Sequence, residues 1–131
     1  MPLAADTNVL ARALTDDGSE QSRRAVECFR DNQIFVPDTV LLETEWLLRS
    51  RLGLKRDQVN GLFWTLLSSP QILFDDRTRV ANATIAHGNG LDFADAMHLF
   101  ASHECEALVT YDEDFIRNSR KIPKTVNVRN P

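Results

Sequence analysis

The chain has 131 residues, of which 43% are hydrophobic and 26% charged, as in an ordinary globular protein. This length predicts a single domain over residues 1–131 with a substantial core. No apolar run approaches the about 20 residues that cross a bilayer, and no signal peptide is visible. Cys28 and Cys105 are far apart and in no metal-ligand spacing, so we expect reduced thiols in a cytoplasmic protein.

Charge is distributed unevenly along the chain. The net charge of −4 argues weakly against nucleic-acid binding. Residues 117–131 carry five basic side chains and no acid, so residues 1–116 carry a net charge of −9. Two interpretations stay open: a solvated C-terminal segment, or a basic rim beside an acidic centre, where it would hold phosphates.

The predicted elements alternate between short apolar strands and longer helical segments. An opening apolar run ends at Asp6, after which apolar residues resume at helical spacing. Further strands are predicted at 34–36, 72–74, 107–110 and 126–128, and helices at 19–30, 39–51, 56–67, 77–87 and 93–103. This alternation predicts an α/β protein, with a parallel sheet covered by helices on both faces.

Acidic side chains follow the predicted strands at one edge of that sheet. Asp6 follows the first strand, Asp112 follows the fourth, and Asp95 lies in the first turn of a helix. Glu43 lies inside the apolar stretch VLLETEWLL, where we expect it on the core-facing stripe, with Glu45 solvated. Because α/β sheets bind ligands beyond the carboxyl ends of their strands, these acids are candidates for one site.

Each acid also has a purely structural interpretation. Asp6 is in position to cap the first helix, and Asp92 and Asp95 have the spacing of a capping box. Residues 112–114 are also compatible with a polar turn, and Glu43 with a buried arginine pair. Four acids at one edge would nevertheless repel one another, so we expect a cation among them.

The type of ligand selects the cation. All candidate ligands are oxygen donors without a Cys or His cluster, which favours Mg²⁺ or Mn²⁺. Carboxylate-held metals serve phosphodiester hydrolysis by activating water and stabilising the leaving oxygen. Asn8 is positioned to fix a carboxylate or a water near Asp6, and His98 either borders the site or packs on its helix.

Three segments of the chain resemble the PIN-domain ribonucleases, and within them the VapC-like toxins of toxin–antitoxin pairs. They are DTNVLAR at 6–12, VLLETEWLLRSRLGL at 40–54 and DFADAMHLFASHECEALVTYDEDF at 92–115. The order and spacing of the three segments make the resemblance more specific than any one of them.

The resemblance assigns the catalytic and metal-binding acids to four positions: Asp6, Glu43, Asp95 and Asp112. Asp114 is an alternative metal ligand to Asp112. Supporting positions fall on Asn8, Thr110 and Asp92. The resemblance leaves the basic residues that contact RNA less defined, and we assign that role to Arg49, Arg51, Arg117 and Lys121.

The resemblance implies a three-layer α/β/α PIN-like fold with a central parallel sheet of about five strands. It implies an endoribonuclease that uses Mg²⁺ (Mn²⁺ is possible) and a metal-activated water to leave a 5′-phosphate and a 3′-hydroxyl. It also implies a homodimer and a cognate VapB-like antitoxin, which we expect to cover Trp46 or Trp64.

Three alternatives remain to be weighed against a toxin. One is a PIN-type nuclease in RNA processing without an antitoxin, and another is a PIN scaffold that binds RNA or protein without cleavage. The third, a phospho-signalling receiver domain, requires an adjacent acid pair after the first strand and a Lys near Thr110. The sequence has neither.

Overall fold

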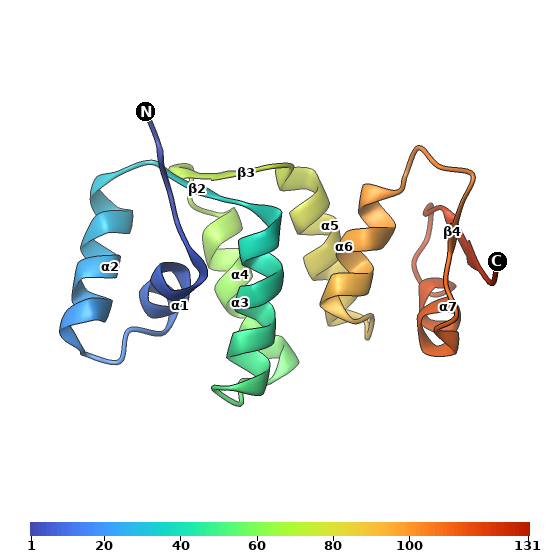
Figure 1. Cartoon of the computed structure of the whole chain (residues 1–131), viewed down its shortest axis with the longest axis horizontal. Coiled ribbons are helices and arrows are strands. Elements are labelled where there is room, and N and C mark those ends of the chain that lie inside the picture. Colours follow the sequence, from blue (N-terminus) through green and yellow to red (C-terminus); the bar gives the residue numbers. More distant parts are fainter. The chain divides into compact units, whose positions relative to one another are not determined.

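A computed structural model describes residues 1–131, which form two compact units, Met1–Arg77 and Thr78–Pro131. Each unit contains its own parallel sheet (Figure 1). The first unit supplies Asp6 and Glu43, and the second supplies Asp95 and Asp112.

The first unit is built on a three-stranded parallel sheet in the order β1-β2-β3. The strands are β1 (Leu3–Ala4), β2 (Ile34–Val36) and β3 (Ile72–Phe74), with Ile34 opposite both Leu3 and Ile72. Helices α1 (Thr7–Thr15) and α2 (Glu20–Asp31) connect β1 to β2, and α3 (Asp38–Ser50) and α4 (Arg56–Leu67) connect β2 to β3. Because the strands are parallel, the chain leaves all three at the same edge of the sheet.

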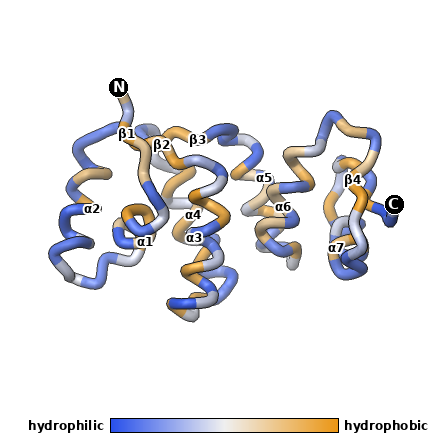
Figure 2. The backbone as a smooth tube through the Cα atoms, viewed as in Figure 1, coloured by the Kyte–Doolittle hydropathy of each residue, from blue (hydrophilic) through white to orange (hydrophobic).

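The core of the first unit joins the sheet to these helices. Its fully buried side chains include Leu10, Ile34, Leu41, Leu48 and Phe63. Burial of each such side chain contributes about 1.5–3 kcal/mol to folding. The tube is hydrophobic along β2 and β3 and mostly hydrophilic along α2 (Figure 2), which fits a helix that buries only a narrow face, at Ser22 and Ala25.

The end of α3 follows the sequence closely. Gly53 has φ +67°, a left-handed conformation that favours glycine, and the Leu54 N–H donates to the Leu48 carbonyl at 3.0 Å. The helix therefore stops one turn beyond Glu45, and the chain turns toward α4.

The second unit pairs two parallel strands, β4 (Ala107–Val109) and β5 (Asn127–Arg129), with Leu108 opposite Val128. Helix α5 (Arg77–Gly88) begins at the boundary residue, α6 (Phe93–Ala101) follows it, and α7 (Glu113–Ser119) connects the two strands. Buried apolar side chains of this unit include Val80, Leu91, Phe93, Leu99 and Phe115.

The structure confirms the predicted α/β class, and its seven helices and parallel strands are consistent with an α/β/α PIN-like fold. The five predicted strands form sheets of three and two strands rather than one sheet. One helix, α7, was not predicted, because residues 112–114 are equally compatible with a polar turn. No helix combines the length and the hydropathy that a membrane-spanning segment requires.

Candidate active site

Asp6 lies directly after β1 and caps α1. Its backbone is extended, its Oδ1 accepts the Thr7 N–H at 2.7 Å, and its carbonyl accepts the Leu10 N–H at 3.0 Å. The capping interpretation is therefore correct, but it uses only one carboxylate oxygen. Asp6 and Asn8 are both exposed, so both side chains are accessible to a ligand at the start of α1.

Glu43 is exposed, which corrects the expectation that it lies on the core-facing stripe of α3. The buried residues of this helix are Val40, Leu41, Thr44, Glu45 and Leu48. Glu43 is two positions from both Leu41 and Glu45, about 200° around the helix from each. Apolar residues flank it in the sequence, but they face a different side of the helix.

Glu45 is the buried acid of α3, contrary to the expectation that it is solvated. It is 4% exposed, and its Oε2 accepts from Arg49 Nε at 2.9 Å while Oε1 accepts from Nη2 at 3.4 Å. The arginine pair considered for Glu43 therefore belongs to Glu45, which the sequence-based site did not include. An i, i+4 Arg was the available signal for this pair.

Asp92 and Asp95 occupy the first turn of α6. The Asp92 side chain accepts the Asp95 N–H at 3.0 Å, which is the capping interaction predicted from their spacing. Asp95 is partly buried, and burial, Asp92 and Asp112 together raise its pKa to about 6, while His98 opposes the shift. The second unit thus holds three carboxylates close enough for two of them to disfavour the charge on the third.

Asp112 follows β4 and caps α7. Its Oδ1 accepts the N–H groups of Asp114 and Phe115 at 3.0 and 3.1 Å, and its own N–H donates to Thr110 Oγ1 at 3.1 Å. Asp114 instead forms an ion pair with Arg117 one turn on. Asp112 is therefore held by the backbone and by Thr110, whereas the Asp114 carboxylate already has a cationic partner.

The four arginines and lysines assigned to RNA have different surroundings. Arg49 is bound to Glu45, Arg117 is paired with Asp114, and the Arg51 guanidinium lies 5.6 Å from the Trp46 ring centroid. Lys121 is exposed, two residues after the end of α7. Arg51 and Lys121 therefore keep their positive charge unpaired by carboxylates.

The donor set suits a hard divalent cation. In the second unit, burial first and then the charges of Asp92 and Asp112 raise the pKa of Asp95, and a bound cation would offset both effects. No three His, Cys, Asp or Glu side chains are close enough to form a metal cluster by themselves. Asp6 and Glu43 are exposed carboxylates of the first unit.

Comparison with known proteins identifies the family of the chain. A search among curated proteins gives no match. The family model of the PIN domain matches residues 4–121, through both units and through all four candidate acids. PIN domains are generally nucleases, act on nucleic acid and typically use divalent metals. With most of its length matched, the chain belongs to the PIN domain family.

Proposed function

We propose that the chain is a metal-dependent endoribonuclease that acts as the toxin of a toxin–antitoxin pair. One observation carries the nuclease part. In a chain of the PIN family, Asp95 is partly buried beside Asp92 and Asp112, and its pKa is raised to about 6. A carboxylate whose pKa is raised by burial and by acidic neighbours is typical of functional sites.

The proposed metal ligands are the four acids Asp6, Glu43, Asp95 and Asp112, with Asp114 as an alternative to Asp112. Their oxygen donors suit Mg²⁺, and Mn²⁺ is also compatible. When bound, such an ion activates water, orients the scissile phosphate and stabilises the leaving oxygen. The oxygen of water attaches to phosphorus and the 3′-oxygen leaves, so the products carry a 5′-phosphate and a 3′-hydroxyl.

Three supporting residues hold or orient these acids. Asp92 fixes the first turn of α6 through the Asp95 N–H, and Thr110 fixes the backbone of Asp112. The Asn8 amide is two residues after Asp6 and is proposed to orient a carboxylate or a water. Phosphate contacts are assigned to Arg51 and Lys121 first, and to Arg49 and Arg117 only if RNA displaces their carboxylate partners.

The match through both units supports one PIN domain over residues 1–131. For the toxin role, the support is the resemblance of the three sequence segments and three exposed apolar side chains on the first unit. Trp46 is 50% exposed, Leu52 53% and Trp64 40%. We propose that a VapB-like antitoxin covers the tryptophans and that the nuclease is a homodimer.

The nuclease is tested by incubating purified protein with labelled total RNA in Mg²⁺, in Mn²⁺ or in EDTA. Asp6→Asn and Asp95→Asn are compared with Glu104→Gln, a matched loss of charge at an exposed acid. Discrete cuts that need metal, persist in Glu104→Gln and disappear in the two Asp variants are expected. RNA binding without cleavage by wild type would favour a non-catalytic PIN scaffold instead.

The toxin role is tested separately by inducing the chain in growing cells. We expect growth arrest by wild type, no arrest by Asp95→Asn, and rescue by the protein encoded beside it. Cleavage in vitro without growth arrest or a neutralising partner would favour a PIN nuclease in RNA processing.

A further inference from the structure

A groove between α1 and α2 lies outside the acids described above. Its volume is about 440 Å³, within the range of roughly 300–1,000 Å³ of small-ligand pockets. The polar lining consists of Asn8, Arg12, Gln21 and Arg24, and the apolar lining includes Val9 and Ala25. No acid lines it, although residues 1–116 carry a net charge of −9.

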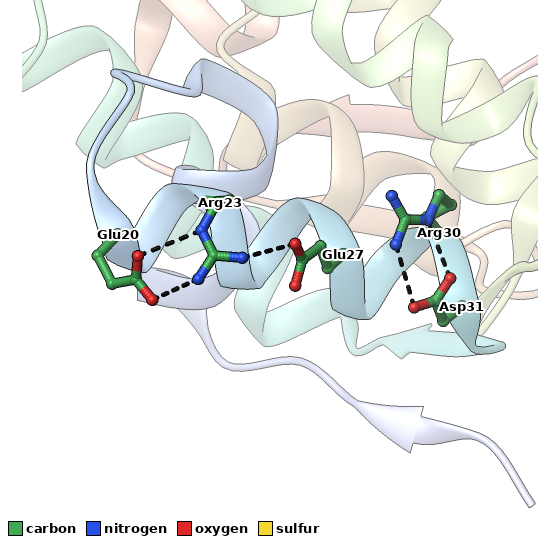
Figure 3. A network of polar contacts seen from close by, with 5 residues as sticks. All are labelled: Glu20, Arg23, Glu27, Arg30 and Asp31. Carbon is green, nitrogen blue, oxygen red and sulfur yellow. Dashed lines mark hydrogen bonds and ion pairs between the residues drawn. The ribbon is translucent and has the colours of Figure 1, made fainter.

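The arginines of α2 differ in their partners. Figure 3 shows Arg23 bonded to Glu20 and Glu27, and Arg30 bonded to Asp31. Arg24 has no carboxylate partner, and it is the one of the three that lines the groove. Two of the three positive charges of this helix are thus neutralised locally, and the third is left for a ligand.

Arg12 brings a second cationic group to the groove from α1. Its Nη1 donates to Ser19 Oγ at 3.5 Å and lies 3.8 Å from Asp17 Oδ2. These contacts are long and use only part of the five-donor capacity of the guanidinium, which can still donate to a ligand. Two guanidinium groups, of which Arg12 is partly paired with Asp17, and two amide side chains form a lining without acids. This lining favours an anionic ligand that also presents hydrogen-bonding edges.

The groove shares one residue, Asn8, with the candidate active site. Asn8 lines it and lies in the first turn of α1, two residues after the cap Asp6. A nucleic-acid chain held at Asp6 by the proposed nuclease would therefore place an adjoining nucleotide near the first turn of α1.

We propose that this groove binds one nucleotide of single-stranded RNA next to the cleaved phosphodiester, which rests on the proposed nuclease function. Arg24 and Arg12 hold a phosphate, and Asn8 and Gln21 donate to or accept from the base edge. Arg24 is thus a substrate-binding residue rather than a catalytic one.

The test measures binding in an Asp95→Asn background, which prevents cleavage. A fluorescein-labelled single-stranded RNA of about 12 nucleotides is titrated by anisotropy in Mg²⁺. Arg24→Gln is compared with Arg23→Gln, the neighbouring residue with the same loss of charge but carboxylate partners on both sides. We expect Arg24→Gln to weaken binding about tenfold and to lower the salt slope by about 0.7. Arg23→Gln should stay close to the parent.

A second measurement places the RNA on the protein. Cys28 lines the groove, whereas Cys105 belongs to the second unit. RNA should slow alkylation of Cys28 and leave that of Cys105 unchanged. Equal effects of the two Arg variants, unprotected Cys28, absence of RNA binding, or displacement of RNA by a Glu-rich peptide would each overturn the proposal. If RNA binds and protects Cys28 but wild type cleaves no RNA, the nuclease proposal fails and the groove remains an RNA-binding site.

Discussion

Arg49 donates two hydrogen bonds to the buried carboxylate of Glu45 one turn before it on α3. The Arg49 side chain is half exposed while that of Glu45 is 5% exposed. The pair therefore explains a charge in the core of the first unit without any ligand. It also separates two acids that the sequence presents as near neighbours, since Glu43 faces solvent.

We expect Glu43→Gln and Glu45→Gln to have opposite effects. Glu43→Gln should abolish metal-dependent cleavage and change the free energy of unfolding by less than about 0.5 kcal/mol, because it is a surface substitution. Glu45→Gln should retain cleavage. It should lower the free energy of unfolding by about 1 kcal/mol, because a charge-assisted hydrogen bond becomes neutral. Urea unfolding and an RNA cleavage assay measure the two effects.

Arg49→Ala extends this comparison. It leaves the Glu45 carboxylate buried and unpaired, so we expect the free energy of unfolding to fall by about 2 kcal/mol. This loss is smaller than for a fully buried pair, because Arg49 is half exposed. A larger loss of stability in Glu43→Gln than in Arg49→Ala would contradict the assignment of Glu45 as the structural acid.

Much of the fold follows from local sequence patterns. The apolar runs at 34–36 and 72–74 form β2 and β3 with the bounds that the sequence predicts, because Pro37 and polar residues delimit them. Helix α7 was missed because it has only seven residues, too few for a periodic pattern. Its available signal was Asp112 followed by the buried pair Phe115 and Ile116.

The functional surface was harder to predict, for physical reasons. On α3 apolar residues occur on several faces, so the sequence alone does not decide which of two glutamates faces the core. The groove beside Arg24 depends on how α1 packs against α2 and on which arginines find carboxylates along α2. Both depend on tertiary contacts, whereas the positions of Asp6 and Asp112 after their strands are set locally.

Asp95→Asn is expected to stabilise the protein at neutral pH. Its pKa is about 6 in the native state and near 3.8 in the unfolded chain, so the native state binds more protons between these values. The free energy of unfolding therefore falls as pH rises through this window. The whole destabilisation by the ionised Asp95 carboxylate is present above pH 6. After allowance for solvent screening, the free energy of unfolding of Asp95→Asn should exceed that of wild type by about 1 kcal/mol at pH 7. This difference should disappear below pH 4.

The matched control is Asp57→Asn, at an exposed acid in the first turn of α4. Chemical denaturation at pH 7 and pH 4 without metal compares the variants. Destabilisation of Asp95→Asn at pH 7 would mean that the ionised carboxylate stabilises the fold, which contradicts the electrostatic argument for the site.

Mg²⁺ should raise the melting temperature of wild type, and the shift should shrink as pH falls through about 6. The reason is that protonation of Asp95 competes with metal binding. The same titration with Asp95→Asn should show little shift at any pH. A shift of equal size in both proteins would indicate that the ion binds elsewhere.

Trp46 and Trp64 should report partner binding. They are 50% and 40% exposed and are the only tryptophans of the chain, so their fluorescence should move to shorter wavelength when an antitoxin covers either ring. Trp46→Phe and Trp64→Phe assign the signal. Truncation of the covered ring to Ala should weaken binding by about 2 kcal/mol. An unchanged spectrum in a formed complex would show that the partner binds a different face.

Asp112 is expected to have two roles that different substitutions separate. Asp112→Ala removes the cap of α7 and should cost about 1 kcal/mol, whereas Asp112→Asn keeps an N-cap residue and most of that stability. Both should lose cleavage, since neither supplies a carboxylate to the metal.

Asp114→Asn breaks only an exposed pair with Arg117, so we expect it to retain both stability and cleavage. Loss of cleavage in Asp114→Asn with activity kept in Asp112→Asn would make Asp114 the fourth acid, and Asp112 would then serve only as the cap of α7.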